Sequence, residues 1–396
     1  MMDGVSRDQV ARIEVFVVDL QQDKPYLGKL REGESVNKSG YFVRKGNRTV
    51  YPRKNRSLVV RVETRDGVVG WGETYGLVAP KATAEIINDL FVGFVVGRDP
   101  FEVEGIYDEL YDLMRVRGYD GGFYHDALAA LDIALWDIAG KIKGSSIAGL
   151  LGGPQKETIP AYVSGLPEDT LAERCDLALS WQERGFHSLK FALPVADEGA
   201  VTEFRGLRKA LGEKARIAVD LHWSLKPAEA IKLGKELAPF QPWFLEAPVI
   251  PEDVEALREV AENSGQQIAA GEEWRTLFDA RLRLDRKACH IVQPEMGHTG
   301  ITAFMRIGKH AERCGATVIP HATIGSGIFL AASLQAAASL PCTTDHEFQH
   351  SIFGSFRHFT GDVLSCDEGH FAVPNSPGLG VEPSEAMLKA MTKVPA

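Results

Sequence analysis

The sequence predicts an α/β protein in which a (β/α)8-type barrel follows a smaller α+β domain. Strand-like and helix-like segments alternate from about residue 158 onward in this chain of 396 residues, which is typical of repeated βα units. The first third instead carries strands and then helices, as α+β domains do. Acidic residues recur at one place in the repeat, the carboxyl ends of the predicted strands, where barrels of this kind build their active sites.

Composition supports an ordered globular protein and excludes several function classes. The chain is 44% hydrophobic and has a net charge of −10, without a long basic run, which argues against nucleic acid or an anionic membrane as partner. No secretory signal or membrane-spanning run is evident. The five cysteines form no CxxC pair, which fits reduced thiols rather than disulfides or a zinc site. We therefore expect a cytoplasmic protein.

The first third of the chain contains short β-rich runs at residues 11–19, 57–64 and 68–75. The last two are joined by a turn at 65–67. Helical spacing of apolar residues follows at about 81–95, 101–116 and 124–142. The polar stretch 20–56 has no clear periodicity, so it is expected to be a functional loop or a disordered one.

The repeat of strand and helix predicts eight units from residue 158 onward. Helices are expected at 227–237, 251–261 and 301–314, among others. A doubly wound sheet is the competing architecture, but it usually has a glycine-rich phosphate turn after its first strand, and none is present. The predicted strands end near Tyr162, Lys190, Asp220, Glu246, Gly271, Pro294, Pro320 and His346.

Three consecutive predicted strands end in an acidic residue. Asp220 closes the run RIAVD, Glu246 closes PWFLE and Glu272 closes QIAAGE, each 26 residues after the previous one. In a barrel these ends converge on one mouth, where three carboxylates would repel one another unless a cation held them. Oxygen ligands favour Mg2+ or Mn2+ over zinc. A single acid at a loop start is commonly just solvated, but three in one register indicate a metal site.

The same spacing continues through the next three units. Glu295 follows IVQP, His321 follows TVIP and Glu347 follows TTDH, again 26 residues apart. His321 and Glu295 would lie on adjacent strand ends, close enough for a carboxylate–imidazole hydrogen bond. Such a partner orients the ring and raises its basicity, as a general base requires. A histidine after a proline is more often structural, but its place beside the acids favours catalysis.

Two other side chains are expected at the mouth. Lys190 belongs to the strand before Asp220, so its ammonium could hold a substrate carboxylate, unless it is an ordinary structural lysine. His222 lies two residues beyond Asp220, so strand alternation would point both side chains the same way. Trp223 could pack over a sugar or cover the barrel rim.

At these residues the sequence resembles the mandelate racemase subgroup of the enolase superfamily over nearly the whole chain. The most specific local piece is residues 127–141, ALAALDIALWDIAGK, which continues through 146–147 to 150–152. The second piece is the strand-end series itself. The resemblance implies an N-terminal capping domain, here residues 1–135 completed by about 370–396. Residues 136–369 would form the catalytic barrel. Loops of the cap, including 20–56 and 72–80, would then cover the mouth and select the substrate.

The resemblance also implies roles for the strand-end residues. Asp220, Glu246 and Glu272 would bind one Mg2+, which chelates the substrate carboxylate. His321, paired with Glu295, would remove the proton α to that carboxylate. Glu347 would hydrogen-bond the oxygen on which enediolate charge develops. Removal of such a weakly acidic proton needs this stabilisation of the developing charge.

Departures from the family pattern favour one reaction. Many members carry two lysines on the second barrel strand, whereas this chain has Lys190 followed by Ala192. A racemase needs acid/base groups on both faces of the carbon, so the missing lysine weakens that reading. The Asp-x-His pattern at 220–222 resembles members that dehydrate aldonic acids, with His222 as the acid for the departing hydroxyl. Glu295 replaces the more usual aspartate.

The sequence therefore predicts an Mg2+-dependent acid-sugar dehydratase that acts on an aldonate or aldarate and yields a 2-keto-3-deoxy acid. An epimerase, racemase or lactone cycloisomerase on the same scaffold is the nearest alternative. A non-catalytic sugar-acid-binding protein is a third. The expected partner is a small sugar acid, with no nucleic acid or membrane. An even-numbered homo-oligomer is a family expectation.

Overall fold

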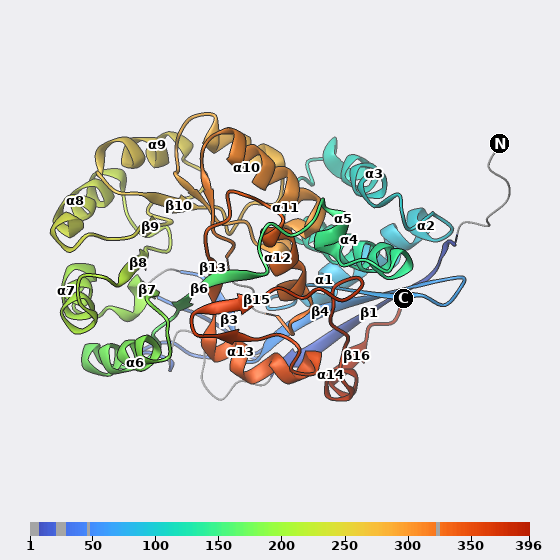
Figure 1. Ribbon diagram of the computed structural model, residues 1–396, viewed down its shortest axis with the longest axis horizontal. Helices are drawn as coiled ribbons and strands as arrows, with labels where there is room; N and C mark the ends of the chain where they lie inside the picture. The colour runs from blue at the N-terminus through green and yellow to red at the C-terminus, as the bar shows by residue number, and fades with distance from the viewer. Residues whose placement is uncertain (1–7, 21–28, 46–47, 322–324) are drawn as a thin grey trace.

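The computed structural model describes residues 8–20, 29–45, 48–321 and 325–396. A barrel of parallel strands ringed by helices lies beside a smaller unit, the cap, built on an antiparallel sheet (Figure 1). The fold is that of an N-terminal cap domain followed by a (β/α)8 barrel, as the sequence predicts. Within the described residues, no helix combines the length and apolar character that crossing a bilayer would need.

The cap sheet has the strand order β16-β1-β4-β5, and all neighbours are antiparallel. In β1, Ile13 and Val15 are buried in the core of the cap, whereas Val18 and Leu20 point to the opposite face and are buried in the larger core that includes the barrel. The strands are β1 (Val10–Leu20), β4 (Asn55–Thr64), β5 (Val69–Tyr75) and β16 (Met391–Lys393).

Helices cover the inner face of this sheet. The long helix α4 packs against β5, where Gly72 leaves room because a Cβ there would overlap the carbonyl oxygen of Ala130. The helix also packs against α11 of the barrel, so the predicted boundary between residues 135 and 136 falls inside a continuous element. The segments are α1 (Pro80–Glu85), the π-helical η1 (Ile86–Phe91), α2 (Val92–Val95), α3 (Val103–Arg115), α4 (Gly122–Lys143) and α5 (Ile147–Leu150).

Eight parallel strands form the barrel in the part of the chain that the structure describes. They run in the order β13-β6-β7-β8-β9-β10-β11-β12, and a parallel bridge between Val318 and Thr343 closes the ring. Their ends lie close to those predicted. The strands are β6 (Thr158–Ser164), β7 (Ser188–Ala192), β8 (Arg216–Asp220), β9 (Leu245–Glu246), β10 (Ile268–Ala270), β11 (Ile291–Val292), β12 (Thr317–Val318) and β13 (His346–Phe348).

Each barrel strand is followed by a helix on the outside (Figure 1). Apolar side chains from alternate positions fill the barrel interior, among them Tyr162, Phe244 and Ile319. The helices are α6 (Leu171–Glu183), α7 (Ala200–Leu211), α8 (Pro227–Leu237), α9 (Val254–Asn263), α10 (Leu277–Leu284), α11 (Met296–Arg313), α12 (Ile328–Ala338) and α13 (His350–Phe356), with short 3-10 turns η2 (Leu193–Val195), η3 (Ala238–Phe240) and η4 (Arg357–Thr360).

The last part of the chain serves both units. The hairpin β14 (Cys366–Asp367) and β15 (His370–Ala372) adds to the barrel through β6. Helix α14 (Glu385–Ala390) then leads to β16, which pairs with β1 in the cap.

The polar stretch 20–56 contains more regular structure than its sequence indicated. Strands β2 (Tyr41–Val43) and β3 (Val50–Pro52) form an antiparallel hairpin. Residues 21–28 and 46–47 of this predicted loop lie outside the described residues. Glu73 in β5 joins cap and barrel because its carboxylate accepts hydrogen bonds from the backbone N–H groups of Ser326 (2.5 Å) and Phe329 (3.1 Å) near the start of α12.

Candidate active site

The strand-end acids come together at the carboxyl end of the barrel. Asp220 and Glu246 end β8 and β9 and lie opposite each other in the parallel register. Glu272 follows β10 by two residues, and Glu347 lies within β13. The barrel therefore brings residues far apart in sequence onto one face, as the spacing of 26 residues predicts.

A cavity of about 420 Å³ opens between this face and the cap. The cap contributes the hairpin residues Val50 and Tyr51 and the loop residues Leu77 and Val78. The remaining lining consists mainly of polar side chains from the end of β5, from α4 and from the barrel: Tyr75, Asp126, Asp220, His222, Trp223, Glu272, Glu273, Arg275, His298, His321 and Gln349.

Lys190 lies beneath this cavity, which corrects its expected role as an open donor to a substrate carboxylate. Its side chain is 3% exposed. Its Nζ lies 2.6 and 2.7 Å from the two carboxylate oxygens of Glu246 and 3.2 Å from Glu347 Oε1. Gln293 Nε2 donates to Glu246 Oε2 at 2.6 Å. A buried carboxylate needs such partners, so the ammonium serves the acids rather than facing the cavity.

The electrostatics of the acids reflect burial and crowding. Burial raises the pKa of Glu246 to about 7 even though Lys190 opposes the rise. Burial also disfavours ionisation of Asp220, but the neighbouring His222 and Lys190 outweigh it and lower the pKa to about 2. Carboxylates with such different pKa values in one site are typical of functional clusters.

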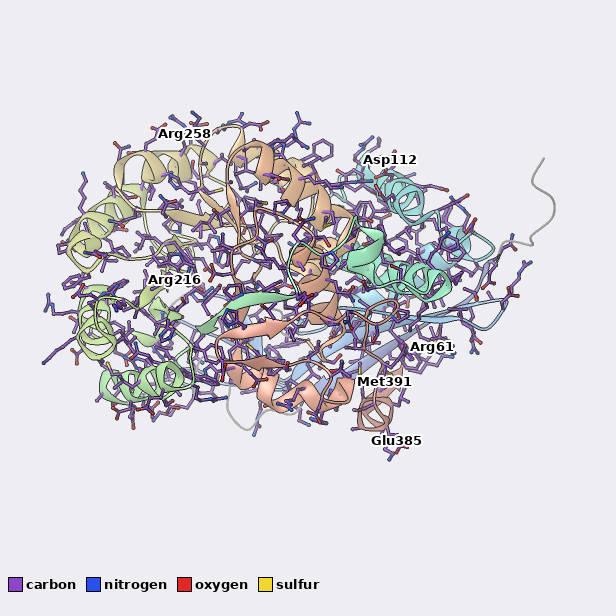
Figure 2. All side chains as sticks on the ribbon, in the orientation of Figure 1. Arg61, Asp112, Arg216, Arg258, Glu385 and Met391 are labelled. Carbon is purple, nitrogen blue, oxygen red and sulfur yellow. The ribbon has the colours of Figure 1, made fainter. Side chains whose placement is uncertain are left out.

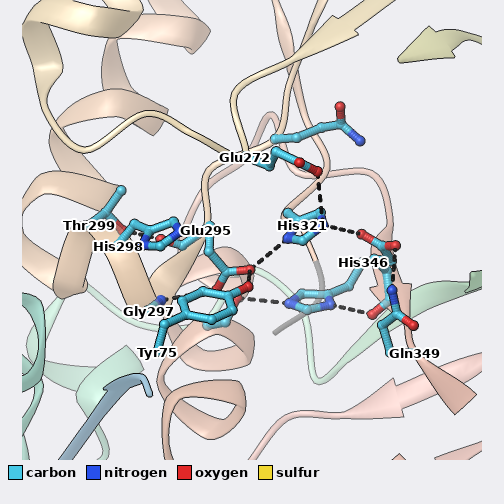
Figure 3. A network of polar contacts seen from close by, with 12 residues as sticks. Tyr75, Glu272, Glu295, Gly297, His298, Thr299, His321, His346 and Gln349 are labelled. Atoms are coloured by element: carbon cyan, nitrogen blue, oxygen red, sulfur yellow. Dashed lines mark hydrogen bonds and ion pairs between the residues drawn. The ribbon is translucent and has the colours of Figure 1, made fainter. Parts of the chain in front are cut away.

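His321 is held by the predicted carboxylate partner. Its Nδ1 lies 2.7 Å from Glu295 Oε2, and Tyr75 Oη donates to the same oxygen at 2.9 Å (Figure 3). The backbone N–H of Gly297 donates to Glu295 Oε1 at 3.0 Å. Glu295 is thus fixed by three partners, and it in turn fixes the tautomer and direction of the imidazole.

The other ring nitrogen of His321 faces the acids. Its Nε2 lies 3.0 Å from Glu272 Oε2 and 3.7 Å from Glu347 Oε2. Burial disfavours the charged ring, but Glu347 and Glu272 outweigh burial and raise the pKa of His321 well above its usual range.

The side chain of His222 lines the cavity, but the backbone that directs it there differs from the predicted strand. β8 ends at Asp220, so strand alternation does not place His222. Its backbone and that of Trp223 are left-handed, with φ of 47° and 51°, a strained conformation for residues with side chains. The turn lets the His222 N–H donate to Asp220 Oδ1 at 2.8 Å and sets its Nδ1 3.0 Å from Asp220 Oδ2.

The sequence pattern does not predict several polar residues of the cavity. Tyr75 ends β5 of the cap, and Asp126 directly precedes the alanine-rich motif of α4. Arg275 and His298 lie three residues after Glu272 and Glu295. For Arg275, in the segment after β10, and His298, in the first turn of α11, the available signal was a place shortly after a strand-end acid, because the segments that follow barrel strands line the mouth.

The donor set fits a hard divalent cation. Ligand atoms of Glu246, Glu272 and His321 lie within 4.8 Å of one another, and Asp220 lines the same cavity. Carboxylate oxygens are the ligands that Mg2+ and Mn2+ prefer. Asp220, Glu246 and Glu272 are therefore the residues that could hold such an ion.

Known proteins share this architecture. Residues 173–387 match the family model "Enolase C-terminal domain-like", and residues 48–152 match "Mandelate racemase / muconate lactonizing enzyme, N-terminal domain". Over 338 residues, the chain is 32% identical to a D-galactarolactone cycloisomerase from Agrobacterium fabrum, covering 82% of this chain and 88% of that protein. It is 30% identical to a D-galactonate dehydratase from Xanthomonas euvesicatoria, covering 88% of this chain and 94% of that protein.

A solved structure agrees closely. The crystal structure of a putative isomerase from Sinorhizobium meliloti superposes with a TM-score of 0.97 at 56% identity, covering 98% of this chain and 100% of that one. Fold and site define a capped barrel enzyme whose acidic residues and histidine meet at the barrel mouth. The chain belongs to the enolase superfamily, with the N-terminal domain of its mandelate racemase/muconate lactonizing enzyme family.

Proposed function

We propose that the protein is an Mg2+-dependent dehydratase of an acid sugar, an aldonate or aldarate. The Cα–H bond next to the carboxylate breaks first, and the bond to the β-hydroxyl breaks with loss of water. The resulting enol then tautomerises to a 2-keto-3-deoxy acid. The observation that carries this proposal is the oriented imidazole of His321, with Nδ1 2.7 Å from Glu295, on a cavity that also presents carboxylates.

Asp220, Glu246 and Glu272 would hold Mg2+, with Mn2+ as the alternative ion. The ion would supply electrostatic stabilisation of the negative charge that develops on the substrate carboxylate. The positive charge of the ion would also oppose the effect of Glu272 on His321. It would therefore lower the pKa of the ring toward the range of a general base.

The other side chains have roles that follow from their positions. His321 takes the α-proton on Nε2, because Nδ1 is engaged by Glu295. His222, on the cavity wall beside Asp220, gives a proton to the departing hydroxyl. Glu347 supports charge on the substrate carboxylate, and Lys190 supplies the positive charge that partners both Glu246 and Glu347 in their buried position. Ala192 offers no base for a second face, which favours elimination over racemisation.

A lactone cycloisomerase is the second candidate, because one relative with 32% identity carries that name. Both reactions begin with removal of an α-proton, so the machinery around His321 serves either. An epimerase would need a second acid/base group on the opposite face of the carbon. Cytoplasmic location and an even-numbered homo-oligomer remain predictions.

Proton NMR of the purified protein with Mg2+ in D2O tests the proposal. Pools of aldonic and aldaric acids are incubated with the protein, and signals of a 2-keto-3-deoxy product are expected. Deuterium incorporation at the α-carbon without loss of water would replace the dehydratase with an epimerase or cycloisomerase. Absence of both exchange and product across the pools would contradict the acid-sugar assignment.

A further inference from the structure

The cavity contains a second carboxylate–imidazole pair that the proposed chemistry does not use. His298 Nδ1 lies 2.7 Å from Asp126 Oδ1, the same distance that joins His321 to Glu295. The guanidinium of Arg275 stands beside both groups, with Nε 3.3 Å from Asp126 Oδ1 and Nη2 3.4 Å from His298 Nδ1. All three side chains line the cavity. We call them the Arg275–His298–Asp126 cluster.

The cluster lies away from the reacting centre. The Tyr75 ring stands between the two histidines, because it stacks on His298 with centroids 4.5 Å apart while its hydroxyl bonds Glu295 (Figure 3). A substrate whose α-carbon lies at His321 therefore meets His298 and Arg275 only with its far end. The cavity of about 420 Å³ leaves room for a chain beyond the two reacting carbons.

The cluster carries donors without partners. Arg275 Nε is buried and makes no hydrogen bond among the described residues, since its contact with Asp126 lacks hydrogen-bond geometry. Among the described residues, Nε2 of His298 has no hydrogen-bond partner, while its Nδ1 is engaged by Asp126. Buried guanidinium donors are costly to leave unsatisfied and match a carboxylate in geometry and charge.

Asp126 has a different task. Burial opposes its ionisation, but His298 and Arg275 outweigh burial and lower the pKa of the carboxyl group. An ionised Asp126 fixes the imidazole through Nδ1 and turns Nε2 toward other partners. Asp126 is therefore a positioning residue, while the two basic side chains would touch the ligand.

We propose that Arg275 and His298 bind a second carboxylate at the far end of the substrate. This inference rests on the proposed acid-sugar chemistry and narrows its substrate class to sugar diacids, the aldarates. A neutral hydroxymethyl end would offer the guanidinium no charge-assisted hydrogen bond beyond its contact with Asp126, so a monoacid of equal length and configuration binds less well.

The test compares matched pairs of acids, galactarate with galactonate and glucarate with gluconate, in the presence of Mg2+. The wild-type protein is expected to favour the diacid of its preferred pair by at least about 10-fold in kcat/KM. Arg275→Met should lower kcat/KM for that diacid by about 10- to 100-fold, as loss of a charge-assisted hydrogen bond does. The kcat/KM of Arg275→Met for the monoacid should stay within about threefold of the wild-type value.

Controls separate binding from folding. Arg258→Met removes an arginine from the outer surface of α9 (Figure 2) and should leave kcat/KM for both substrates unchanged. His298→Gln should act as Arg275→Met does. Asp126→Asn should raise KM for the diacid while sparing kcat and the monoacid, whereas a merely structural loss would lower kcat for both substrates.

Other outcomes overturn one proposal or both. Equal or better turnover of the monoacid by the wild-type protein overturns the diacid inference and leaves the dehydratase standing. An equal loss for both acids in Arg275→Met, with an unchanged melting temperature, also overturns it. If no acid sugar undergoes exchange or dehydration, the proposed function itself fails.

Discussion

His125 shows what burial does to a single ionisable residue. Its two ring nitrogens have no hydrogen-bond partner among the described residues, and its ring lies 5.2 Å from that of Tyr111 and 6.0 Å from that of Tyr124. Burial lowers the pKa of His125 to about 4, and the charge of Arg275 adds to the effect. The folded protein thus holds this side chain neutral where an unfolded chain would protonate it.

The pH dependence of stability should reveal this residue. Between its unfolded pKa, near 6.5, and its folded pKa, the unfolded state binds more protons, so the free energy of unfolding falls as pH falls. We expect His125 to account for about 2 kcal/mol of the loss between pH 7.5 and pH 5. Urea unfolding of His125→Phe at the two pH values should show a loss of unfolding free energy that is smaller than the wild-type loss by that amount. The exposed control His358→Phe should keep the wild-type slope, and a wild-type slope in His125→Phe would refute the assignment.

His321 supports a prediction about chemistry. Asparagine can still bond Glu295 but cannot take a proton at neutral pH, so His321→Asn should lower the rate of α-proton exchange in D2O by at least about 100-fold. Stabilisation of the fold by Mg2+ should persist, because the three proposed carboxylate ligands remain. His358→Asn, on the surface, is the matched control. Exchange at the wild-type rate in His321→Asn would assign the base to another residue.

At this scale the sequence could predict residues that follow a rule of spacing. The six strand-end residues form two sets, Asp220–Glu246–Glu272 and Glu295–His321–Glu347, each spaced by 26 residues, and could be found from that spacing. His222 lines the cavity, but a left-handed turn rather than the predicted strand alternation directs its side chain. The place of Asp126 in the cavity could not be predicted, because the sequence of a helix does not show which part of the barrel its first turns will face.

At the scale of elements, the contact between α4 and β5 depends on the absence of side chains. Cβ atoms at Gly70 and Gly72 would overlap the carbonyl oxygens of Ala134 and Ala130. These are backbone atoms of a 22-residue helix, which cannot move away as a flexible side chain could. The helix therefore lies as close to the sheet as the two backbones allow.

Gly72→Ala should lower the free energy of unfolding by about 3 kcal/mol, because overpacking forces α4 and β5 apart. Gly105→Ala is the matched control. Gly105 lies in the exposed part of α3 with nothing within 4 Å of its Cβ direction, so alanine should leave stability unchanged or raise it by up to about 1 kcal/mol. Chemical denaturation of both variants measures the difference, and equal stabilities would contradict this view of the contact.

Elements with strong periodicity were predictable, and those without it were not. Helix α8 begins and ends where its pattern predicts, at Pro227 and Leu237. The hairpin of β2 and β3 was missed because three-residue strands are too short to show alternation. The antiparallel pairing of the two strands, with Tyr41 opposite Pro52 and Val43 opposite Val50, defines it.

For the whole molecule, the cap is held by segments from both ends of the sequence. Strand β16 pairs with β1, Lys393 Nζ lies 2.7 Å from Glu14 Oε1, and the Val394 N–H donates to Val15 O at 2.9 Å. Because the cap places Tyr51 of β3 and Leu77 of the loop after β5 in the cavity wall, the stability of the sheet and the shape of the site are linked.

Deletion of residues 391–396 should therefore affect more than the deleted strand. Loss of several backbone hydrogen bonds is expected to lower the free energy of unfolding by about 2 to 3 kcal/mol. KM for the acid identified by NMR should rise more than kcat falls, because the chemistry on the barrel is untouched. Thermal unfolding and steady-state kinetics measure the two effects. Unchanged stability would show that β16 contributes nothing to the cap.

The position of β16 in the sequence also sets an order of events during synthesis. The ribosome makes β1 first and β16 only after every strand of the barrel. The edge of β1 that β16 covers therefore stays open while the barrel emerges, and the barrel mouth can form before the cap sheet is complete. During that interval the unpaired edge of β1 is open to pairing with strands of other chains, which the arrival of β16 then prevents.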